Sequence, residues 1–329
     1  MLTIYSNETH RASRGEAVPH ESLQIDNWVY EIKTACAGFG TDEDKLSNAL
    51  ATKTASERYL ISARYPELQR VSLLSEMKSE VSGSYGKLLQ LLAQPLEEAE
   101  ALIIRDATKG AGTNEKLVYP VLGGRTADEL LILKKAYFKT FAQDMAVVLA
   151  DDLGGDLKVF VQAILNINPP AYNPEIHTPA KAAEVAEVIY KAGEGKWGTD
   201  ESAFCNALVA IPPAFLSSVN AAYIAKHGNS LERAIEKEFG GKAEDALLYH
   251  VGMILHPIET IAGQFEKTMK GIGTDEYNLS AAIVRYQHLL PQVKQAYKDK
   301  YDTPLRDRIY GETSGNYRKV LLAIVEQAS

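Results

Sequence analysis

The chain has 329 residues, of which 46% are hydrophobic and 24% are charged, and its formal net charge is −8. This composition is ordinary for a globular protein, and the acidic balance disfavours nucleic acid as a partner, because a phosphate backbone is bound by a positive field. The same charge disfavours direct attraction to an anionic membrane, so binding to such a surface would need a cation in between.

Neither a leader nor a membrane-spanning segment is expected from the pattern of apolar residues. Residues 1–22 contain no apolar segment of signal-peptide length. The longest apolar stretches, such as residues 157–165, fall well short of the ~20 residues that span a bilayer. The two cysteines, Cys36 and Cys205, show no metal-ligand spacing and are typical of free thiols in a reducing compartment. We therefore expect a soluble cytoplasmic protein.

Four similar segments follow one another along the chain. The string Gly-x-Gly-Thr-(Asp/Asn)-Glu occurs at residues 38–43, 110–115 and 271–276, and a variant, KWGTDE, occupies residues 196–201. An amphipathic segment precedes each string, and further helical segments lead to an apolar run at residues 87–93, 157–165, 246–255 or 319–325. These runs are apolar on all sides, which is typical of central buried helices. Period-two alternation is nearly absent, so the sequence predicts an all-α protein.

The spacing of the strings indicates the domain organisation. Their second glycines, Gly40, Gly112, Gly198 and Gly273, are separated by 72, 86 and 75 residues. The longer middle interval contains a Pro-rich stretch, residues 166–179, which we interpret as a connector between two halves of the chain. We expect an N-terminal tail at residues 1–20, repeats at 21–93, 94–166, 179–255 and 256–329, and a linker at 167–178.

A distant acidic residue accompanies each string. By itself the string has a structural interpretation, in which the glycines end one helix and the threonine caps the next. However, an acidic residue lies 40 positions after the second glycine in three repeats (Glu80, Asp152 and Glu238) and 39 positions after it in the fourth (Glu312). A capping motif does not require a recurring distant carboxylate, whereas a composite ion site does.

Calcium fits this combination of groups. A helix C-terminus leaves carbonyl oxygens unpaired, and glycines let the chain turn several of them toward one point. Three loop carbonyls and a bidentate carboxylate supply about five of the roughly 6–8 oxygen ligands that calcium takes. The open positions suit water or a phosphate oxygen, so the sequence predicts calcium sites that bridge to lipid headgroups.

The loop tips favour the same interpretation. The residue beside the second glycine is apolar in every loop: Phe39, Ala111, Trp197 and Ile272. Lysines stand in three of the loops: Lys109, Lys196 and Lys270. An apolar tip flanked by lysine is typical of a membrane interface, where each lysine contributes on the order of 1 kcal/mol. For any single tip the alternative is a side chain tucked into its own loop.

With the string and the distant acid together, the sequence resembles the annexin family over about residues 21–327. The resemblance implies four repeats of about five helices each, arranged as a curved disc with the calcium loops on the convex face. It implies a short N-terminal tail on the opposite face. It also implies calcium-dependent binding to acidic phospholipid membranes, with peripheral association when calcium rises.

Carried over to matching positions, the resemblance implies one calcium site per repeat, made of three backbone carbonyls and one carboxylate. The implied ligands are Cys36, Gly38, Gly40 and Glu80 in the first repeat, Thr108, Gly110, Gly112 and Asp152 in the second, Gly193, Lys196, Gly198 and Glu238 in the third, and Met269, Gly271, Gly273 and Glu312 in the fourth. By position, Glu100 and Arg125 are expected to form an ion pair between helices.

Two other classes of function remain for comparison. An enzyme is disfavoured, because the first string lacks the third glycine of a dinucleotide fingerprint and the seven histidines form no ligand pair at i, i+4. We therefore expect no catalytic residues. An EF-hand is excluded because its acidic loop motif is absent. The stronger alternative is a calcium-independent helical-repeat scaffold or cytoskeleton-binding protein, since helical arrays often serve as interaction surfaces.

Overall fold

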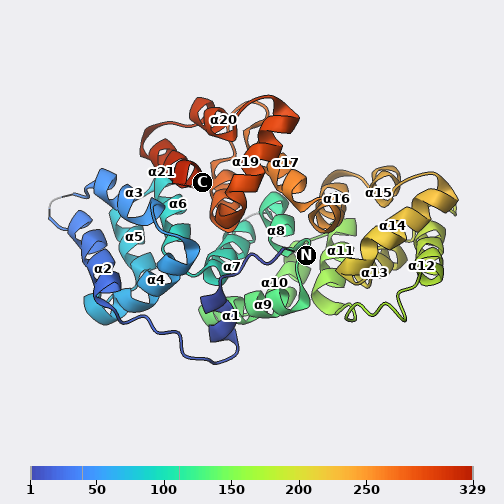
Figure 1. The fold of residues 1–329 in the computed structure, drawn as a ribbon, viewed down its shortest axis with the longest axis horizontal. Coiled ribbons are helices and arrows are strands. Elements are labelled where there is room, and N and C mark those ends of the chain that lie inside the picture. The colour runs from blue at the N-terminus through green and yellow to red at the C-terminus, as the bar shows by residue number, and fades with distance from the viewer. Residues whose placement is uncertain (1, 39, 111, 328–329) are drawn as a thin grey trace. The chain divides into compact units, whose positions relative to one another are not determined.

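The computed structural model describes residues 2–38, 40–110 and 112–327, and every element in these ranges is a helix (Figure 1). A short helix, α1 (Asn7–Ser13), precedes four sets of five α-helices. The first set comprises α2 (Leu23–Ala35), α3 (Glu43–Ala51), α4 (Ala55–Gln69), α5 (Leu73–Glu80) and α6 (Gly83–Leu92). The second comprises α7 (Leu96–Ala107), α8 (Glu115–Leu122), α9 (Ala127–Phe141), α10 (Met145–Asp152) and α11 (Gly155–Asn166).

The last two sets follow the same order of helices. The third comprises α12 (Pro179–Ala192), α13 (Glu201–Val209), α14 (Pro213–His227), α15 (Leu231–Glu238) and α16 (Gly241–Leu255). The fourth comprises α17 (Pro257–Met269), α18 (Glu276–Arg285), α19 (Leu290–Tyr301), α20 (Leu305–Glu312) and α21 (Gly315–Gln327), with a 3-10 turn, η1 (Gln287–Leu289), before α19. The prediction of an all-α protein with four five-helix repeats is confirmed.

Side chains that cap helix N-termini set many of these boundaries. At the start of α4, Thr54 and Glu57 form a capping box, in which each side chain binds the backbone N–H of the other residue. The start of α12 combines a Thr178 cap with Pro179 in the first turn, where the missing N–H of proline costs no helical hydrogen bond. The short polar segments between the helices therefore carry the signals that divide the chain into helices.

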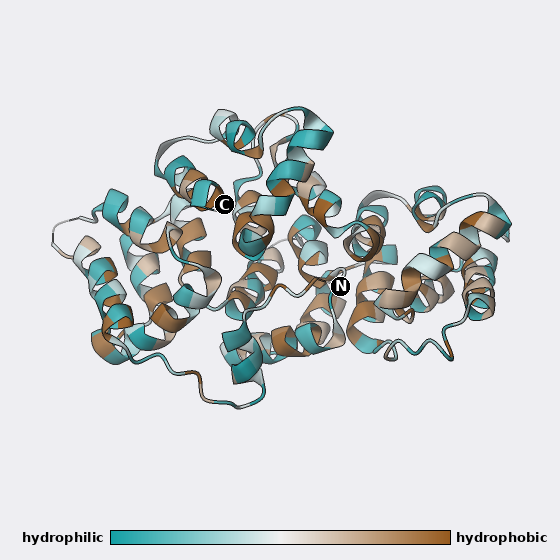
Figure 2. Cartoon of the chain, in the orientation of Figure 1, coloured by the Kyte–Doolittle hydropathy of each residue, from teal (hydrophilic) through white to brown (hydrophobic). Residues whose placement is uncertain are grey.

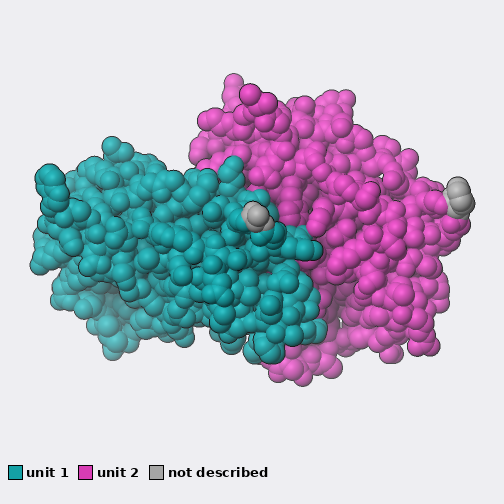
Figure 3. All heavy atoms as spheres, turned by 180° about the vertical axis from the view of Figure 1, so that it is seen from behind, with its two compact units in different colours: residues 1–3, 104–260 teal, residues 4–103, 261–329 magenta. Residues whose placement is uncertain are grey.

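The repeats associate in two compact units, which are coloured separately in Figure 3. Unit 1 consists of residues 1–3 and 104–260, and unit 2 consists of residues 4–103 and 261–329. In unit 2, α3 and α6 of the first repeat pack against α18 and α21 of the fourth. In unit 1, α8 and α11 of the second repeat pack in the same way against α13 and α16 of the third.

Residues 166–179 join the second repeat to the third, and the expected bounds of the repeats and of the linker stay predictions. This stretch joins α11 to α12, and both helices belong to unit 1. The Pro-rich composition indicates an extended segment, and a segment of this kind can join two repeats that pack on each other as well as two that do not. Composition alone does not distinguish these cases.

The apolar runs at the end of each repeat form buried helices, as predicted. In α6, Leu88, Leu89 and Leu92 are fully buried, and the corresponding helices α11, α16 and α21 are buried along most of their length. Figure 2 shows apolar residues concentrated on these helices and on single faces of the others. Burying one such side chain stabilises the fold by about 2 kcal/mol. None of the described helices combines the length and the apolar character needed to cross a membrane.

The N-terminal tail is bound to unit 2 through buried side chains. Ile4 and Tyr5 are buried, and the Tyr5 hydroxyl donates to Glu100 Oε2 at 2.5 Å. In α1, the Thr9 hydroxyl donates to Glu97 Oε2 at 2.9 Å. Burial raises the pKa of Glu97 to about 7 despite this hydrogen bond. The tail is therefore an integral part of the core of unit 2.

A buried ion pair lies beneath the tail. Glu100 on α7 accepts a hydrogen bond from Arg285 Nε at 2.7 Å, and both side chains are almost completely buried. In unit 1, Arg125 Nε lies 3.7 Å from Oε2 of Glu129, and the expected pairing of Glu100 with Arg125 stays a prediction. Removing one partner from such a buried pair costs about 3–5 kcal/mol.

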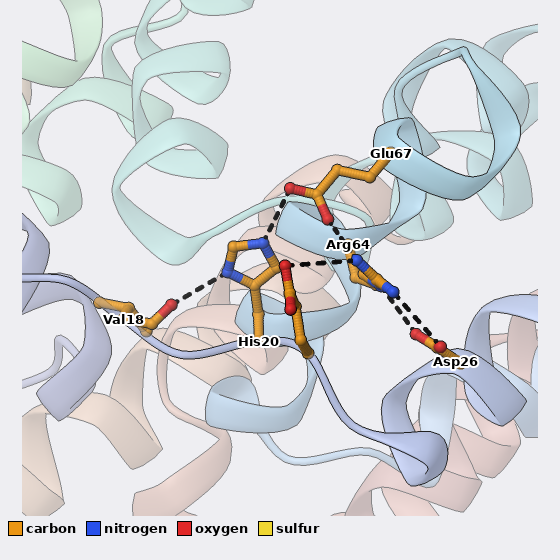
Figure 4. Close-up of polar contacts among 6 residues, drawn as sticks. Val18, His20, Asp26, Arg64 and Glu67 are labelled. Carbon is orange, nitrogen blue, oxygen red and sulfur yellow. Dashed lines mark hydrogen bonds and ion pairs between the residues drawn. The ribbon is translucent and has the colours of Figure 1, made fainter.

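A second attachment of the tail involves a histidine (Figure 4). The two ring nitrogens of His20 lie 3.0 Å from the Val18 carbonyl oxygen and 3.1 Å from Glu67 Oε1. Glu67 also accepts from Arg64, whose Nε donates to Asp26 Oδ1 at 2.7 Å. The hydrogen bond to Glu67 raises the pKa of His20 above its ordinary value. Protonated His20 is therefore bound more strongly than neutral His20.

We predict that this attachment stabilises the protein in a pH-dependent way. Because the pKa of His20 is raised in the folded state, its contribution is fully present below the unfolded pKa of about 6.5 and is lost as pH rises through the folded value. In urea unfolding, the unmodified protein should exceed His20→Gln by up to about 1 kcal/mol near pH 5.5 and by much less near pH 8.5. An equal difference at the two pH values would contradict this assignment.

Candidate functional site

Four loops connect the first helix of each repeat to the second: α2 to α3, α7 to α8, α12 to α13 and α17 to α18. A backbone hydrogen bond closes each loop at its base, because the N–H of the residue before the second helix donates to a carbonyl at the end of the first. These bonds run from Asp42 to Ala35, Asn114 to Ala107, Asp200 to Ala192 and Asp275 to Thr268, at 2.8, 2.8, 2.7 and 2.8 Å. The base of every loop therefore has the same geometry.

Glycines give the loops their backbone course. In the first loop, Gly38 and Gly40 have φ angles of 104° and 88°, which other residues rarely adopt. The equivalent positions with positive φ are Gly110, Gly112, Gly198, Gly271 and Gly273. In this conformation the peptide units on either side of each glycine turn away from the helical direction, so their carbonyls are available to a ligand.

The residue that caps the second helix is the one after the threonine. Asp42 Oδ1 accepts from the Lys45 N–H at 3.1 Å, Asp200 accepts from Ala203, and Asp275 accepts from Asn278. The interpretation of the threonine as the helix cap is therefore wrong. The aspartates satisfy the exposed N–H groups of the first helical turn, which leaves the threonine hydroxyl for another partner.

That partner is the distant acidic residue in all four repeats. Each acid is the last residue of the fourth helix in its repeat, α5, α10, α15 or α20. The hydroxyls of Thr41 and Thr199 donate to a carboxylate oxygen of Glu80 and Glu238, the first at 2.5 Å. Thr113 donates to the backbone carbonyl of Asp152 at 3.0 Å, and Thr274 donates to the carbonyl and to Oε2 of Glu312 at 3.0 and 3.2 Å. Sequence reasoning missed these four threonines, although they are invariant in the repeated string.

Further contacts show how closely loop and acid approach each other. A Cβ placed on Gly193 would lie 3.1 Å from Cγ of Glu238, so the carboxylate side chain lies directly over this glycine. In the first repeat, burial and the nearby Glu80 carboxylate raise the pKa of the Cys36 thiol to about 12. Cys36 thus keeps its proton and would offer its backbone carbonyl rather than a thiolate.

The third loop is longer than the others by one residue and carries its own polar network. Glu194 accepts from the Tyr223 hydroxyl at 2.9 Å, from Asn229 at 3.0 Å and from Lys237 Nζ at 2.7 Å. Partial burial opposes ionisation of Glu194, but the bonds from Lys237 and Tyr223 outweigh it and lower the pKa of this carboxyl. The network fixes the longer loop against α14 and α15.

In the fourth repeat an arginine joins two of the expected ligands. Arg308 on α20 donates to the Met269 carbonyl oxygen at 2.6 Å and to Glu312 Oε1 at 2.8 Å. A single cationic group therefore contacts a loop carbonyl and the distant carboxylate at once. Sequence reasoning missed Arg308; the available signal was a basic residue one helical turn before the acid, which the other repeats lack.

The loop tips differ in what the structure describes. Trp197 and Ile272 are completely exposed, with relative accessibilities of 104% and 110%, and Lys109, Lys196 and Lys270 are exposed beside the loops. For Trp197 and Ile272, the alternative of a side chain tucked into its own loop is wrong. The tips Phe39 and Ala111 lie outside the described residues.

The donors around these loops suit a hard divalent cation. Carbonyl, hydroxyl and carboxylate oxygens are the ligands that calcium takes. Within residues 2–38, 40–110 and 112–327, no group of three or more His, Cys, Asp or Glu side chains converges. Each candidate site thus combines one acidic side chain with backbone oxygens. The contacts of Arg308 support this fit, because a cation bound by Met269 and Glu312 occupies the place expected for the ion.

Comparisons with known proteins identify the family. A family model for annexins matches residues 29–92, 98–164, 184–249 and 261–324. Annexin A5 of Rattus norvegicus is 33% identical over 297 residues, covering 89% of this chain and 92% of that protein. Annexin A13 of Mus musculus is 33% identical over 314 residues, covering 93% and 96%. The solved structure of annexin III has a TM-score of 0.86 at 26% identity, covering 95% of this chain and 96% of that chain.

An array of four five-helix repeats, each with a glycine loop beside a distant acid, defines a class of helical repeat proteins with a candidate ion site in each repeat. The chain belongs to the annexin family, as the resemblance of its sequence indicated. Calcium-dependent binding to phospholipid is a general property of this family.

We predict that the threonine-to-acid hydrogen bond stabilises the loops without calcium. Thr199→Val removes the hydroxyl that binds Glu238 and should lower the free energy of unfolding in a chelator by about 1 kcal/mol. Thr140→Val is a matched control in the same unit, because its hydroxyl binds only a carbonyl of its own helix, and the change should stay within about 0.5 kcal/mol. Equal effects in urea unfolding would show that the bond contributes nothing specific.

Proposed function

We propose that the chain binds calcium at one site in each of its four repeats and uses the bound ions to attach to acidic phospholipid membranes. The observation that carries this proposal is the hydrogen bond from each loop threonine to the distant acidic residue, which brings two parts of the chain about 40 residues apart to one place. The proposed ligands are the carbonyls and carboxylates of the same residues that the family resemblance implies.

Backbone and side-chain oxygens of the protein would form an incomplete coordination shell around the ion. Three carbonyls and one carboxylate leave about two positions open, which water or a lipid phosphate oxygen can fill. Bound calcium would supply the positive charge that a chain of net charge −8 otherwise lacks toward an anionic surface. The Asp152 side chain is one methylene shorter than those of the other three acids and is exposed, so its carboxylate would extend less far toward the loop.

The exposed tips support attachment to a membrane. Trp197 and Ile272 offer apolar surface at the ends of two loops, and a lysine lies close to each. An indole suits the headgroup region, and the lysines add attraction to anionic lipid. We propose that Phe39, Ala111 and Lys109 take the same part in the first two loops. The protein would be cytoplasmic and would associate peripherally with membranes when calcium rises.

The proposed activity is binding and not catalysis. A calcium-independent scaffold that binds cytoskeletal or other proteins is the alternative. Co-sedimentation with acidic liposomes distinguishes the two, because only the proposed function requires calcium. Sedimentation that is equal in calcium and in chelator would contradict the proposed function.

We predict that neutralising the four distant acids abolishes calcium-dependent sedimentation with acidic liposomes. The changes are Glu80→Gln, Asp152→Asn, Glu238→Gln and Glu312→Gln. The new amide oxygens at positions 80, 238 and 312 still accept the hydrogen bonds from the threonines, and the bond from Thr113 goes to the backbone carbonyl of Asp152. Stability in chelator should therefore change by no more than about 0.5 kcal/mol per site. The calcium concentration required for binding should rise at each site on the order of tenfold or more, because an amide is a weaker calcium ligand than a carboxylate.

The matched control neutralises one exposed acid in each repeat away from the loops. Its changes are Glu31→Gln, Asp128→Asn, Glu184→Gln and Glu259→Gln. This variant has the same net charge as the first and should sediment like the unmodified protein. A quadruple loop variant that still sediments in calcium would rule out the assigned carboxylates.

We predict that Trp197 reports membrane contact by its fluorescence. Trp28 lies partly buried in α2 beneath Lys53 Nζ, which is 5.5 Å from the ring centroid, and Trp28→Phe leaves Trp197 as the sole emitter. Emission should shift to shorter wavelength when both calcium and acidic liposomes are present, because a fully exposed indole enters a less polar region. The Trp197→Phe variant retains Trp28 and should show no such shift.

A further inference from the structure

Arg308 occupies the fourth loop in a way that the other loops do not share. Its guanidinium donates to the Met269 carbonyl oxygen at 2.6 Å and to Glu312 Oε1 at 2.8 Å, and its side chain is only 30% exposed. Its Nε also lies 3.6 Å from Glu266 Oε2 on α17. The arginine thus spans the end of α17, the end of α20 and the base of the loop between α17 and α18.

The two oxygens that Arg308 contacts are two of the proposed calcium ligands. A guanidinium and a calcium ion both seek carboxylate and carbonyl oxygens, so these donors serve either cation but not both at once. Two positive charges within a few ångströms of each other would also repel strongly in a partly buried place. The local geometry therefore couples calcium binding in this loop to the position of one side chain.

The other repeats carry no cation at this position. Arg308 stands four residues before the acid, one helical turn away on the same face of α20. The equivalent residues are Glu76, Val148 and Ala234. A carboxylate, a valine and an alanine cannot take the place of a metal ion, so this feature distinguishes the fourth repeat from the rest.

We propose that Arg308 is a built-in competitor for calcium, so that the fourth site fills only at calcium concentrations that displace its guanidinium. This inference rests on the proposed function of the loops as calcium sites. At low calcium, Arg308 neutralises Glu312 and keeps the fourth loop closed. At high calcium, the ion takes Met269 and Glu312, and the guanidinium is released.

Glu266 provides a place for the displaced guanidinium. Its Oε2 is already 3.6 Å from Arg308 Nε, and the Tyr297 hydroxyl donates to the same oxygen. A small rotation of the arginine side chain would therefore exchange Glu312 for Glu266 without leaving the charge unpaired. This alternative partner limits the cost of release, so that the competition weakens calcium binding without preventing it.

Calorimetric titration of the fourth site alone tests the proposal. The background variant carries Glu80→Gln, Asp152→Asn and Glu238→Gln, which leaves only the fourth carboxylate. Adding Arg308→Gln to this background should raise calcium affinity on the order of tenfold, the value of one charge-assisted hydrogen bond that no longer has to be broken. Arg308→Met is a second neutral variant and should show the same gain.

Arg306→Gln is the matched control. Arg306 lies on the same helix, and its replacement removes the same charge. Its side chain pairs with Asp307 and Glu326 at the surface, away from the loop. Its effect on calcium affinity should be about twofold or less, since exposed charges are screened by solvent and salt. Urea unfolding in chelator verifies that each variant is folded before titration.

Nuclear magnetic resonance of the arginine side chains gives a readout independent of affinity. Arg308 donates to Glu312 and Met269 from Nη1 and Nη2, so its Nη–H signals should be protected from solvent exchange in chelator and should shift when calcium binds to the background variant. The Arg306 signals should stay unchanged.

The outcomes separate this inference from the proposed function. Equal calcium affinity for Arg308→Gln and Arg306→Gln would overturn the competition while leaving calcium binding intact. Absence of calcium binding in the background variants, with binding by the unmodified chain, would also overturn it, because the fourth loop would then not be a calcium site. Absence of binding by the unmodified chain would overturn the proposed function, and this inference with it.

Discussion

The hydrogen bond between a loop threonine and the last residue of the fourth helix is the interaction on which the candidate site depends. It connects two parts of a repeat that are 38 or 39 residues apart, and it does so in all four repeats. Two local features make it possible. The backbone bond at the base of the loop fixes the position of the threonine, and the following aspartate or asparagine occupies the cap position of the next helix. The threonine hydroxyl is therefore directed to the acid and not to the helix that follows it.

The four loops share these hydrogen bonds but differ in the charged side chains around them. The oxygens gathered at each loop carry negative or partial negative charge, so each loop favours a cation. In the fourth repeat the chain itself supplies one, Arg308, whose bonds to Met269 and Glu312 show that a single positive group can satisfy both. In the third repeat Lys237 and Tyr223 hold Glu194 instead, which fixes the loop and leaves Glu238 to Thr199. Repeats with the same loop backbone can thus differ in their affinity for the same ion. The reason is that a neighbouring cationic side chain, where one is bound to the loop oxygens, must be released before the ion can bind.

The buried charges of unit 2 serve a different purpose from those of the loops. Glu100 and Arg285 are almost fully buried and are covered by Tyr5 of the tail, whose hydroxyl bonds to the same carboxylate. A buried pair of this kind contributes little net stability, but it penalises any arrangement that separates its members. It therefore favours one mutual arrangement of α7 and α18, and it makes the docked tail part of that arrangement. The polar contacts of the loops, by contrast, lie where solvent and ligands can reach them.

The sequence by itself determined the helical class, the four repeats and the pairing of each loop with its distant acid. These features follow from periodicity, from glycines that alone tolerate positive φ, and from a spacing that recurs four times. It did not determine that the second repeat packs on the third while the first packs on the fourth, or that Glu100 pairs with Arg285. It also assigned the cap to threonine when the aspartate holds it, and it gave no role to Arg308. Each of these was decided by tertiary structure, because side chains of similar chemistry at equivalent positions compete for the same partner, and only the packing of the helices brings one of them within hydrogen-bonding distance.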